Sequence, residues 1–366
     1  MGRIWGSAVS ASFEVKAAAG SYSVVVESNS FDGILNGFDK PVVIADEFFA
    51  SRFSELGRDA VFVKALESAK SLEASPPLIE RIRKGGATRQ TELVAVGGGI
   101  VQDLSAFVAS VYMRGLKWSY VPTTVLAMVD SCIGGKSSIN VGPYKNLVGT
   151  IHPPARVMVD PALAQTLPGD QKASGLIEAV KICFCRGKEA FDRHISYGPS
   201  VAMSVDALEQ VIVNSLLAKK WFIEIDEFDK KERLLLNFGH TFGHAIEGAS
   251  HFAISHGIAV GMGIVCALEF ERQSGESYSG APRVRVLEEH LDRMVREVPG
   301  VDGQVAALDV DEVLERFESD KKHGPANYTL ILVSSSGEVA LRKIEKSAVV
   351  RERVKNAITA MVERYR

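Results

Sequence analysis

Histidines gather in one stretch of this sequence at a spacing that could bind a metal ion. His240 and His244 lie four residues apart in "NFGHTFGHAIE", so on a helix they share one face, and His256 opens a second helix-like segment in "SHGIAVGMG". Two imidazoles from different helices can converge on one divalent ion, and the neighbouring glycines would let those helices approach closely. Backbone-bonded core histidines are common singly, but that alternative explains a cluster poorly. The spacing therefore predicts a metal site.

A catalytic site of the zinc type needs a third protein ligand and one open position. The segment "GLIEAVK" offers the best donor, since Glu178 and Lys181 lie three residues apart and would face the same way on a helix. An ordinary surface pair is the alternative. The surrounding residues are apolar, however, and an unpaired carboxylate among them would be costly. Glu178 is therefore the expected third ligand.

A second stretch carries the residue types that bind phosphate. It reads "VPTTVLAMVDSCIGGKSSINVGPYKNLVG" and combines hydroxyls, a glycine pair and two lysines. Hydroxyls, flexible glycines and ammonium groups together suit a polyanion, with lysine acting as a point charge. The residues that could do this work are Thr123, Thr124, Asp130, Lys136, Lys145 and Asn146.

A third pattern is typical of a nucleotide site. "ELVAVGGGIVQD" is an apolar strand that runs into Gly97, Gly98 and Gly99 and then into a helix-like segment with Asp103. Glycines let the backbone approach a pyrophosphate, and the following helix offers free N–H groups. The spacing is not that of the common dinucleotide motif, so a turn without a ligand remains an alternative. Asp46 ends the strand "PVVIAD", where its carboxylate could bind a ribose hydroxyl or simply cap the next helix.

The elements around these residues predict two domains. Up to about residue 167, β-branched runs such as "SYSVVVES", "KPVVIAD" and "LKWSYVPTT" alternate with helical stretches, which favours an α/β domain on a largely parallel sheet. Beyond "TLPGD", long helix-period segments such as "VDALEQVIVNSLLAKKWFIEI" predominate. We therefore expect a Rossmann-like α/β domain over residues 1–167 and a mainly helical domain over residues 168–366.

Composition excludes several classes of protein. The 366 residues carry a formal net charge of −3, so the basic surface of a nucleic-acid-binding protein is not expected. The longest apolar runs are too short and too interrupted to span a membrane. The first residues carry no apolar stretch typical of a secretory signal, so we expect a cytoplasmic protein. Four irregularly spaced cysteines indicate reduced, mostly buried thiols.

These motifs, taken in order, resemble those of the 3-dehydroquinate synthase family of sugar phosphate cyclases. The motifs are "GGGIVQD", "YMRG", "VPTTVLAMVDSCIGGKSSIN", "KNLVG", "IEAVK" and "NFGHTFGHAIE" followed by "SHGIAVGMG". The resemblance covers residues 93–263 most clearly, with weaker support at "DKKHG". It implies an NAD-binding N-terminal domain, a helical C-terminal domain and one divalent metal ion, zinc or cobalt.

The resemblance also assigns residues. It implies that Glu178, His240 and His256 bind the metal ion. Arg114 of "YMRG" would reach the phosphate of the neighbouring subunit's substrate, which implies a homodimer. The expected substrate pocket is lined by Asp130, Lys136, Asn146, Lys181, Lys219, Asp229, Arg233, Asn237, His244 and one of Lys321 and Lys322. The expected cofactor-binding residues are Asp46, Glu73, Gly97, Gly98, Gly99, Asp103, Thr123, Thr124, Asp130, Lys136 and Lys145.

The family's reaction implies transient oxidation of a substrate hydroxyl by NAD, elimination of phosphate, return of the hydride, and ring opening followed by aldol closure. The first candidate substrate is 3-deoxy-arabino-heptulosonate 7-phosphate. A related cyclase acting on sedoheptulose 7-phosphate or glucose 6-phosphate is an alternative. A metal-dependent polyol dehydrogenase of the same two-domain plan is another, although it would need no phosphate-binding residues.

Four positions depart from the family pattern. Asp229 stands where glutamate is usual, and Pro76 stands where an E-x-x-K stretch beginning at Glu73 would place a nucleotide-binding lysine. Cys132 replaces a serine, and His152 replaces an aromatic residue. We expect Asp229 to draw back from its partner and one cofactor contact to be missing.

Overall fold

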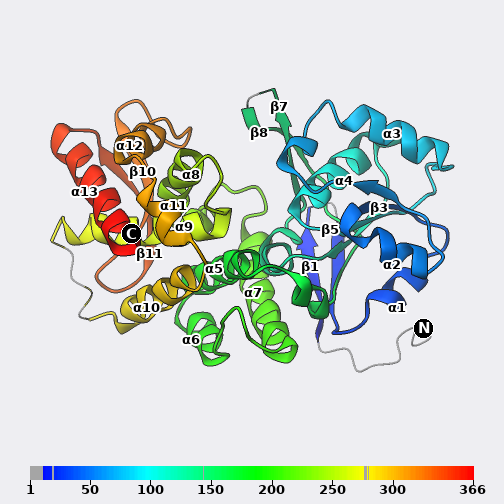
Figure 1. Ribbon diagram of the computed structural model, residues 1–366, viewed down its shortest axis with the longest axis horizontal. Helices are drawn as coiled ribbons and strands as arrows, with labels where there is room; N and C mark the ends of the chain where they lie inside the picture. Colours follow the sequence, from blue (N-terminus) through cyan, green and yellow to red (C-terminus); the bar gives the residue numbers. More distant parts are fainter. Residues whose placement is uncertain (1–10, 19, 143, 276–277, 279) are drawn as a thin grey trace. The chain divides into compact units, whose positions relative to one another are not determined.

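The structure is a computed structural model that describes residues 11–18, 20–142, 144–275, 278 and 280–366 (Figure 1). The first ten residues, on which the expectation of no secretory signal partly rests, lie outside the described residues. The described chain forms two compact units. Unit 1 contains the described residues up to Leu167 together with Ser204–Glu227, and unit 2 contains Pro168–Met203 and Phe228–Arg366.

Unit 1 is an α/β domain built on one main sheet and a hairpin. Its elements are β1 (Ala11–Ala17), β2 (Gly20–Val26), α1 (Phe31–Asn36), β3 (Val42–Asp46), η1 (Glu47–Phe49), α2 (Ala50–Glu55), β4 (Val61–Val63), η2 (Glu67–Ala69), α3 (Ser75–Lys84), β5 (Leu93–Gly97), α4 (Gly99–Val111), η3 (Tyr112–Arg114), β6 (Trp118–Pro122), η4 (Ala127–Ser131), β7 (Lys136–Val141), β8 (Tyr144–Ile151), β9 (Arg156–Val159), η5 (Pro161–Thr166) and α7 (Val205–Ile225).

The main sheet is parallel except at one edge. Its strand order is β1-β2-β9-β6-β5-β3-β4, and only β1 pairs antiparallel, with β2. Strands β5 and β6 are buried along their whole length, as expected of a parallel sheet covered on both faces. Because side chains alternate between faces, Val94 and Val96 pack with Phe31 and Phe53 of α1 and α2, whereas α4 contacts the same strands from the other side. The predicted parallel α/β sheet is confirmed.

Unit 2 is mainly helical, as predicted. Its elements are α5 (Gly169–Arg186), α6 (Lys188–Ser196), η6 (Glu232–Asn237), α8 (His240–Ala249), α9 (His256–Arg272), α10 (Pro282–Arg296), α11 (Val301–Ala306), α12 (Val310–Glu318), β10 (Asn327–Val333), β11 (Val339–Glu345) and α13 (Ala348–Tyr365). Helix α9 packs against α5, α8, α10 and α13 and is buried along most of its length. It is the central helix of this unit.

Helix α7 belongs to unit 1, although the predicted boundary at residue 167 would place it in the second domain. Helix α7 follows that boundary in sequence, but it packs against β1, η4 and η5 of unit 1. Side-chain bonds anchor it there: Glu224 accepts from the backbone N–H of Lys16 at 3.0 Å. Helical periodicity predicts the helix but does not say which unit it packs against.

No helix among the described residues is both long enough and apolar enough to cross a membrane. All four cysteines are free, and Cys132, Cys183 and Cys266 are buried, as expected.

Candidate active site

The helices of unit 2 that carry His240, His244 and His256 approach each other closely. Helix α8 starts at His240, directly after Gly239, whose φ of 77° favours glycine, and α9 starts at His256. A Cβ on Gly263 would lie 2.1 Å from the carbonyl oxygen of Gly239, and one on Gly243 would lie 2.9 Å from Cα of Val260. Only glycine permits this approach, so the predicted role of these glycines is confirmed.

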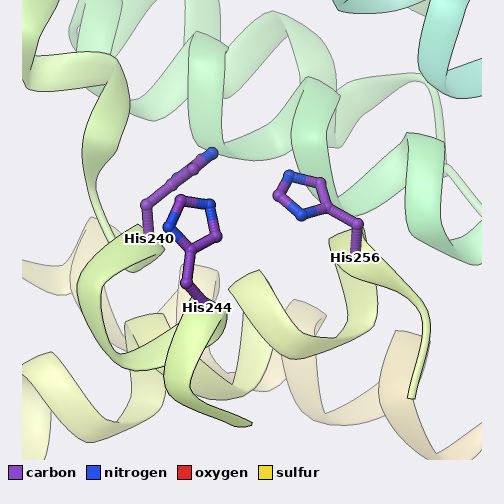
Figure 2. Close-up of side chains that lie close together, drawn as sticks. All are labelled: His240, His244 and His256. Carbon is purple, nitrogen blue, oxygen red and sulfur yellow. The ribbon is translucent and has the colours of Figure 1, made fainter. Parts of the chain in front are cut away.

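The imidazoles of His240, His244 and His256 point into one space between these helices (Figure 2). One ring nitrogen from each lies within 4.8 Å of the others. Glu178 of α5 reaches the same place, because its Oε1 lies 3.8 Å from Nε2 of His240 and 3.7 Å from Nε2 of His256. Atoms that are each about 2.1 Å from one ion lie no more than about 4.2 Å apart, so Oε1 of Glu178 is close enough to share an ion with either histidine.

Two sets of three ligands are therefore possible, one with Glu178 and one with His244. Burial favours Glu178. Its side chain is 1% exposed, and Oε1 has no hydrogen-bond partner among the residues that the structure describes, whereas His244 is exposed. A buried, unbonded carboxylate oxygen costs free energy unless a cation is present. Lys181 is ion-paired with the other oxygen, Oε2, which leaves Oε1 facing the histidines. The donor set fits a divalent metal ion.

The far nitrogen of each metal-facing histidine is also bonded. Nδ1 of His240 lies 3.3 Å from the carbonyl oxygen of Phe238, and Nδ1 of His256 lies 3.1 Å from Oε2 of Glu247. A carbonyl can only accept, so Nδ1 of His240 donates and its Nε2 carries the lone pair that a metal requires. The carboxylate of Glu247 selects the same tautomer in His256. The sequence analysis missed Glu247, although it stands in the quoted motif "GHAIE".

Burial and charge set the protonation of the cluster. Burial, together with the positive charge of Lys181, holds the pKa of His240 well below its ordinary value. Burial also disfavours protonation of His256, but its bond to Glu247 and the nearby Glu178 carboxylate outweigh burial and raise the pKa. His240 is therefore neutral near pH 7, the form in which an imidazole binds a metal ion.

The "DKKHG" turn brings one of its two lysines toward His244. Desolvation, and then the positive charge of Lys322, lower the pKa of His244 to about 4. The ammonium of Lys322 donates to Asp320 at 2.6 Å and is half-buried, whereas Lys321 is exposed. The structure thus favours Lys322 over Lys321 as the lysine near His244, a choice that the sequence left open.

Arg233 and Asn237 of η6 are two further predicted pocket residues in unit 2. Arg233 is buried, and its Nε lies 3.3 Å from Oδ1 of Asp229, so the shorter carboxylate still reaches an arginine partner. Asp229 adopts a positive φ of 58°, a conformation that aspartate tolerates better than most residues. The amide of Asn237 donates to the carbonyl oxygen of Leu234 at 3.1 Å. Asp229 is thus 29% exposed and paired with Arg233.

In unit 1, Asp130 and Lys219 come together from distant parts of the chain. The ammonium of Lys219 lies 2.6 Å from Oδ1 of Asp130, and Lys219 is buried on α7. Asp130 belongs to η4, a short π-helical segment, a form that often occurs at functional sites. The structure therefore brings together two of the predicted pocket residues.

The other predicted phosphate-binding residues are exposed on the hairpin and a nearby turn. Lys136 begins β7, and Lys145 and Asn146 lie on β8. Lys145 is 3.8 Å from a carboxylate oxygen of Glu67. Arg114 is exposed in a turn where it and Met113 both have positive φ, at 71° and 48°. Such strain is stored mainly at functional positions.

The three glycines after β5 have different surroundings. A Cβ on Gly97 would lie 2.5 Å from Val101, and one on Gly98 would lie 2.9 Å from Cγ2 of Thr124, so packing alone excludes larger residues there. A Cβ on Gly99 would meet no described atom within 4 Å, and Gly99 begins α4. This open helix N-terminus fits a diphosphate. Thr123 donates its N–H to the carbonyl oxygen of Gly97, at 3.0 Å.

The contacts of Asp46 and Glu73 do not indicate a nucleotide site. Oδ1 of Asp46 accepts from the N–H of Phe48 at 3.1 Å, so Asp46 caps η1, as in the structural alternative. Glu73 is exposed. Their assignment to the cofactor remains a prediction from the resemblance.

The sequence analysis missed Lys70, which has the clearest contacts in this region. Lys70 is buried, and its ammonium donates to Asp103 at 3.1 Å and to Oδ1 of Asn146 at 2.9 Å. The sequence contains an E-x-x-K motif in "ESAK", at Glu67 and Lys70. This motif precedes Glu73, where the sequence-based prediction placed it. Lys70 is therefore a candidate for the nucleotide-binding lysine that Pro76 replaces in the stretch beginning at Glu73.

The remaining departures have local structural roles. Nε2 of His152 donates a hydrogen bond to the carbonyl oxygen of Leu116 at 2.9 Å. The backbone N–H of His152 donates to the carbonyl oxygen of Gly135 at 2.7 Å. Cys132 is buried, and burial raises the pKa of its thiol to about 12, so the thiol is protonated near pH 7.

Comparison with known families covers most of the chain. A model described as the 3-dehydroquinate synthase N-terminal region matches residues 60–174, and one described as its C-terminal region matches residues 175–323. A 3-dehydroquinate synthase of Saccharolobus solfataricus is 35% identical over 260 residues, covering 70% of this chain and 72% of the relative. That of Dictyoglomus turgidum is 33% identical over 309 residues, covering 83% and 84%.

Solved structures share the fold. A 2-deoxy-scyllo-inosose synthase complexed with carbaglucose-6-phosphate, NAD+ and Co2+ has a TM-score of 0.82 at 24% identity, over 96% of this chain and 99% of that one. A 2-epi-5-epi-valiolone synthase of Streptomyces hygroscopicus with NAD+ and Zn2+ has a TM-score of 0.76 at 23% identity, over 94% and 97%. A probable glycerol dehydrogenase of Sinorhizobium meliloti has a TM-score of 0.60 at 15% identity, over 93% and 96%.

Proposed function

This chain belongs to the 3-dehydroquinate synthase family, and on that premise we propose that it converts 3-deoxy-arabino-heptulosonate 7-phosphate into 3-dehydroquinate and inorganic phosphate. One observation carries the proposal: His240 and His256 face the buried Oε1 of Glu178, which has no hydrogen-bond partner among the described residues. Such a site is suited to a catalytic metal ion rather than to a surface ion pair.

Glu178, His240 and His256 would hold one divalent ion, zinc or cobalt. When bound, the ion supplies Lewis acidity to a substrate hydroxyl, and NAD supplies a hydride acceptor that is restored within each turnover. The role of this chain's residues is to keep the ligands in place. Lys181 neutralises one oxygen of Glu178, while Phe238 and Glu247 orient the two imidazoles.

Binding of NAD is assigned to unit 1. The open N-terminus of α4 at Gly99 would receive the diphosphate, since its N–H groups are directed along the helix axis toward that end. Asp103 and Lys70 would fix the adjacent part of the nucleotide site, because Lys70 joins Asp103 of α4 to Asn146 of the hairpin.

Each unit carries donors suited to a phosphate group. In unit 1 these are Lys136, Lys145 and Asn146, and in unit 2 they are His244 and Lys322. A neutral His244 beside the ammonium of Lys322 can hold a proton at one ring nitrogen and accept one at the other. Arg114 would serve the neighbouring subunit of a homodimer, and its exposure in a strained turn supports that assignment.

The substrate assignment rests on Arg233. A buried guanidinium can bind a carboxylate through two charge-assisted hydrogen bonds, whereas a neutral hydroxymethyl group offers only a weaker, uncharged hydrogen bond. The pairing with Asp229 at Nε orients the guanidinium. An acid substrate is therefore favoured over sedoheptulose 7-phosphate and glucose 6-phosphate.

The test compares phosphate release from the three sugar phosphates by purified protein with NAD and zinc or cobalt. We expect kcat/KM for the heptulosonate phosphate to exceed that for sedoheptulose 7-phosphate at least about tenfold, as roughly 1.4 kcal/mol from one charged contact gives. Arg233→Ala should narrow this ratio, while Arg285→Ala, which removes an exposed arginine of α10, should leave it unchanged. A better rate with either neutral sugar phosphate would reject the acid substrate.

A further inference from the structure

Three successive backbone carbonyls of η4 each accept a hydrogen bond from a side chain of another element. Ser215 Oγ donates to the oxygen of Val129 at 2.9 Å, and Lys219 Nζ donates to that of Asp130 at 2.5 Å. Gln102 Nε2 donates to the oxygen of Ser131 at 2.7 Å. Helix α7 thus supplies two of the donors and α4 supplies the third.

The geometry of η4 explains why it requires these donors. The last carbonyls of any helix lack partners within the helix, and a buried carbonyl without one is costly. Ser215 and Lys219 lie four residues apart on α7, so they present donors one turn apart to consecutive carbonyls. Gln102 also accepts from the hydroxyl of Ser131 at 2.6 Å, so that pair is joined in both directions.

Burial separates the support from the residue that it supports. Ser215 is 0% exposed and Gln102 is 3% exposed, so neither faces a substrate. The carboxylate of Asp130, between the two outer carbonyls, is 25% exposed and paired with Lys219. The bonds from Ser215 and Gln102 therefore fix the backbone on both sides of the one acidic side chain in this segment.

We propose that Gln102 and Ser215 are positioning residues that hold Asp130, and through it the ammonium of Lys219, in the orientation that the reaction requires. This inference rests on the proposed function, together with the assignment of Asp130 and Lys219 to the substrate pocket that the family resemblance implies. Gln102 and Ser215 act only through the backbone of η4. Their loss should thus impair the chemical step more than substrate binding.

The test uses Gln102→Met and Ser215→Ala, which remove each donor with little change in shape. We expect kcat for phosphate release to fall about 10- to 100-fold, with KM within about threefold, because a small displacement of reacting groups affects the transition state most. Ser110→Ala is the matched control, since Ser110 bonds Phe107 within its own helix α4. Its kcat should equal that of the wild type.

Amide hydrogen exchange provides a second readout that does not depend on turnover. In both variants the amides of residues 127–132 should exchange about tenfold faster, with no change in Ser110→Ala. Faster exchange without a loss of kcat would overturn the proposal, as would unchanged exchange in both variants. If both variants lose stability and change KM but keep the kcat of the wild type, Gln102 and Ser215 have a purely structural role and the proposal fails.

The two arms separate this inference from the proposed function. If the wild type releases no phosphate from any of the three sugar phosphates, the proposed function fails, and exchange alone decides whether Gln102 and Ser215 hold η4. If one of the two variants does not fold, the other decides the proposal, since each removes one donor to a carbonyl of η4. Unchanged exchange and kcat in the variant that folds would then overturn the proposal.

Discussion

The proposed metal-ligand cluster of unit 2 and the proposed nucleotide and phosphate region of unit 1 are built in different ways. In unit 2, His240 and His256 stand at the first positions of two helices that pack through glycines, and Glu178 faces them from a third. In unit 1, the corresponding residues lie on a hairpin, a strained turn and a short π-helical segment.

This difference determines how each region responds to change. Helix packing fixes the positions of the unit 2 side chains, so removing one of the three expected ligands should have a larger effect than removing an outer partner such as Glu247. Side-chain bonds such as those of Lys70 fix the unit 1 region, so removing a single supporting residue should be enough to weaken it.

The largest expected effect is loss of the metal ion. Glu178→Ala, His240→Ala and His256→Ala should each lose bound metal and turnover, because each removes one of three protein ligands. His244→Ala should retain metal and lose turnover. Metal content by elemental analysis after gel filtration decides between these outcomes, and full occupancy in one of the first three variants would remove that residue from the ligand set.

A smaller loss is expected in unit 1 from Lys70. Lys70→Met should weaken NAD binding about tenfold or more, because it leaves the partly buried carboxylate of Asp103 without its cation. Glu73→Ala is the control and should change affinity less than about twofold if the E-x-x-K motif stands at Glu67 and Lys70. Calorimetric titration with NAD measures both, and the reverse ranking would restore the motif to Glu73.

The support of His256 can be tested at the same scale. Glu247→Ala should weaken metal affinity about 10- to 100-fold, as loss of an outer partner of a ligating histidine commonly does, and Glu247→Gln should lose less because it keeps an acceptor. Competition with a chromophoric chelator gives the affinity. Glu315→Ala, an exposed position on α12, serves as control, and an affinity of Glu247→Ala equal to that of this control would contradict the role.

The smallest effect concerns stability in acid. Burial holds the pKa of His194 well below 6.5, and burial with the charge of Arg293 lowers that of its neighbour His290 to about 3. Because the folded pKa is depressed, the unfolded chain binds the proton first. The stability from a neutral His194 is complete above about pH 6.5 and is lost as the pH falls below it.

Between pH 7 and pH 5, His194 alone should account for about 2 kcal/mol of the fall in unfolding free energy. His194→Phe should remove that part of the fall in urea titrations. His251→Asn, at an exposed position with positive φ, should not change the fall. An equal fall in wild type and His194→Phe would contradict the expected acid sensitivity of this buried pair.

The same contrast explains what the sequence could predict. Spacing of three or four residues on a helix predicts which side chains share a face, so His240 and Glu178 could be placed from their motifs. Glu247 and Lys70 act through contacts between elements, which spacing alone does not determine. The packing of α7 against unit 1 was missed for that reason, and with it the support that Ser215 gives to Asp130.

The central claim is that this chain eliminates phosphate without net oxidation. The most direct measurement follows phosphate release and NADH absorbance together, with the heptulosonate phosphate, NAD and a divalent metal ion. We predict that NAD is required, that phosphate accumulates over many turnovers, and that NADH does not accumulate with it. NADH formed in proportion to product would contradict the cyclase and favour a dehydrogenase of the same fold.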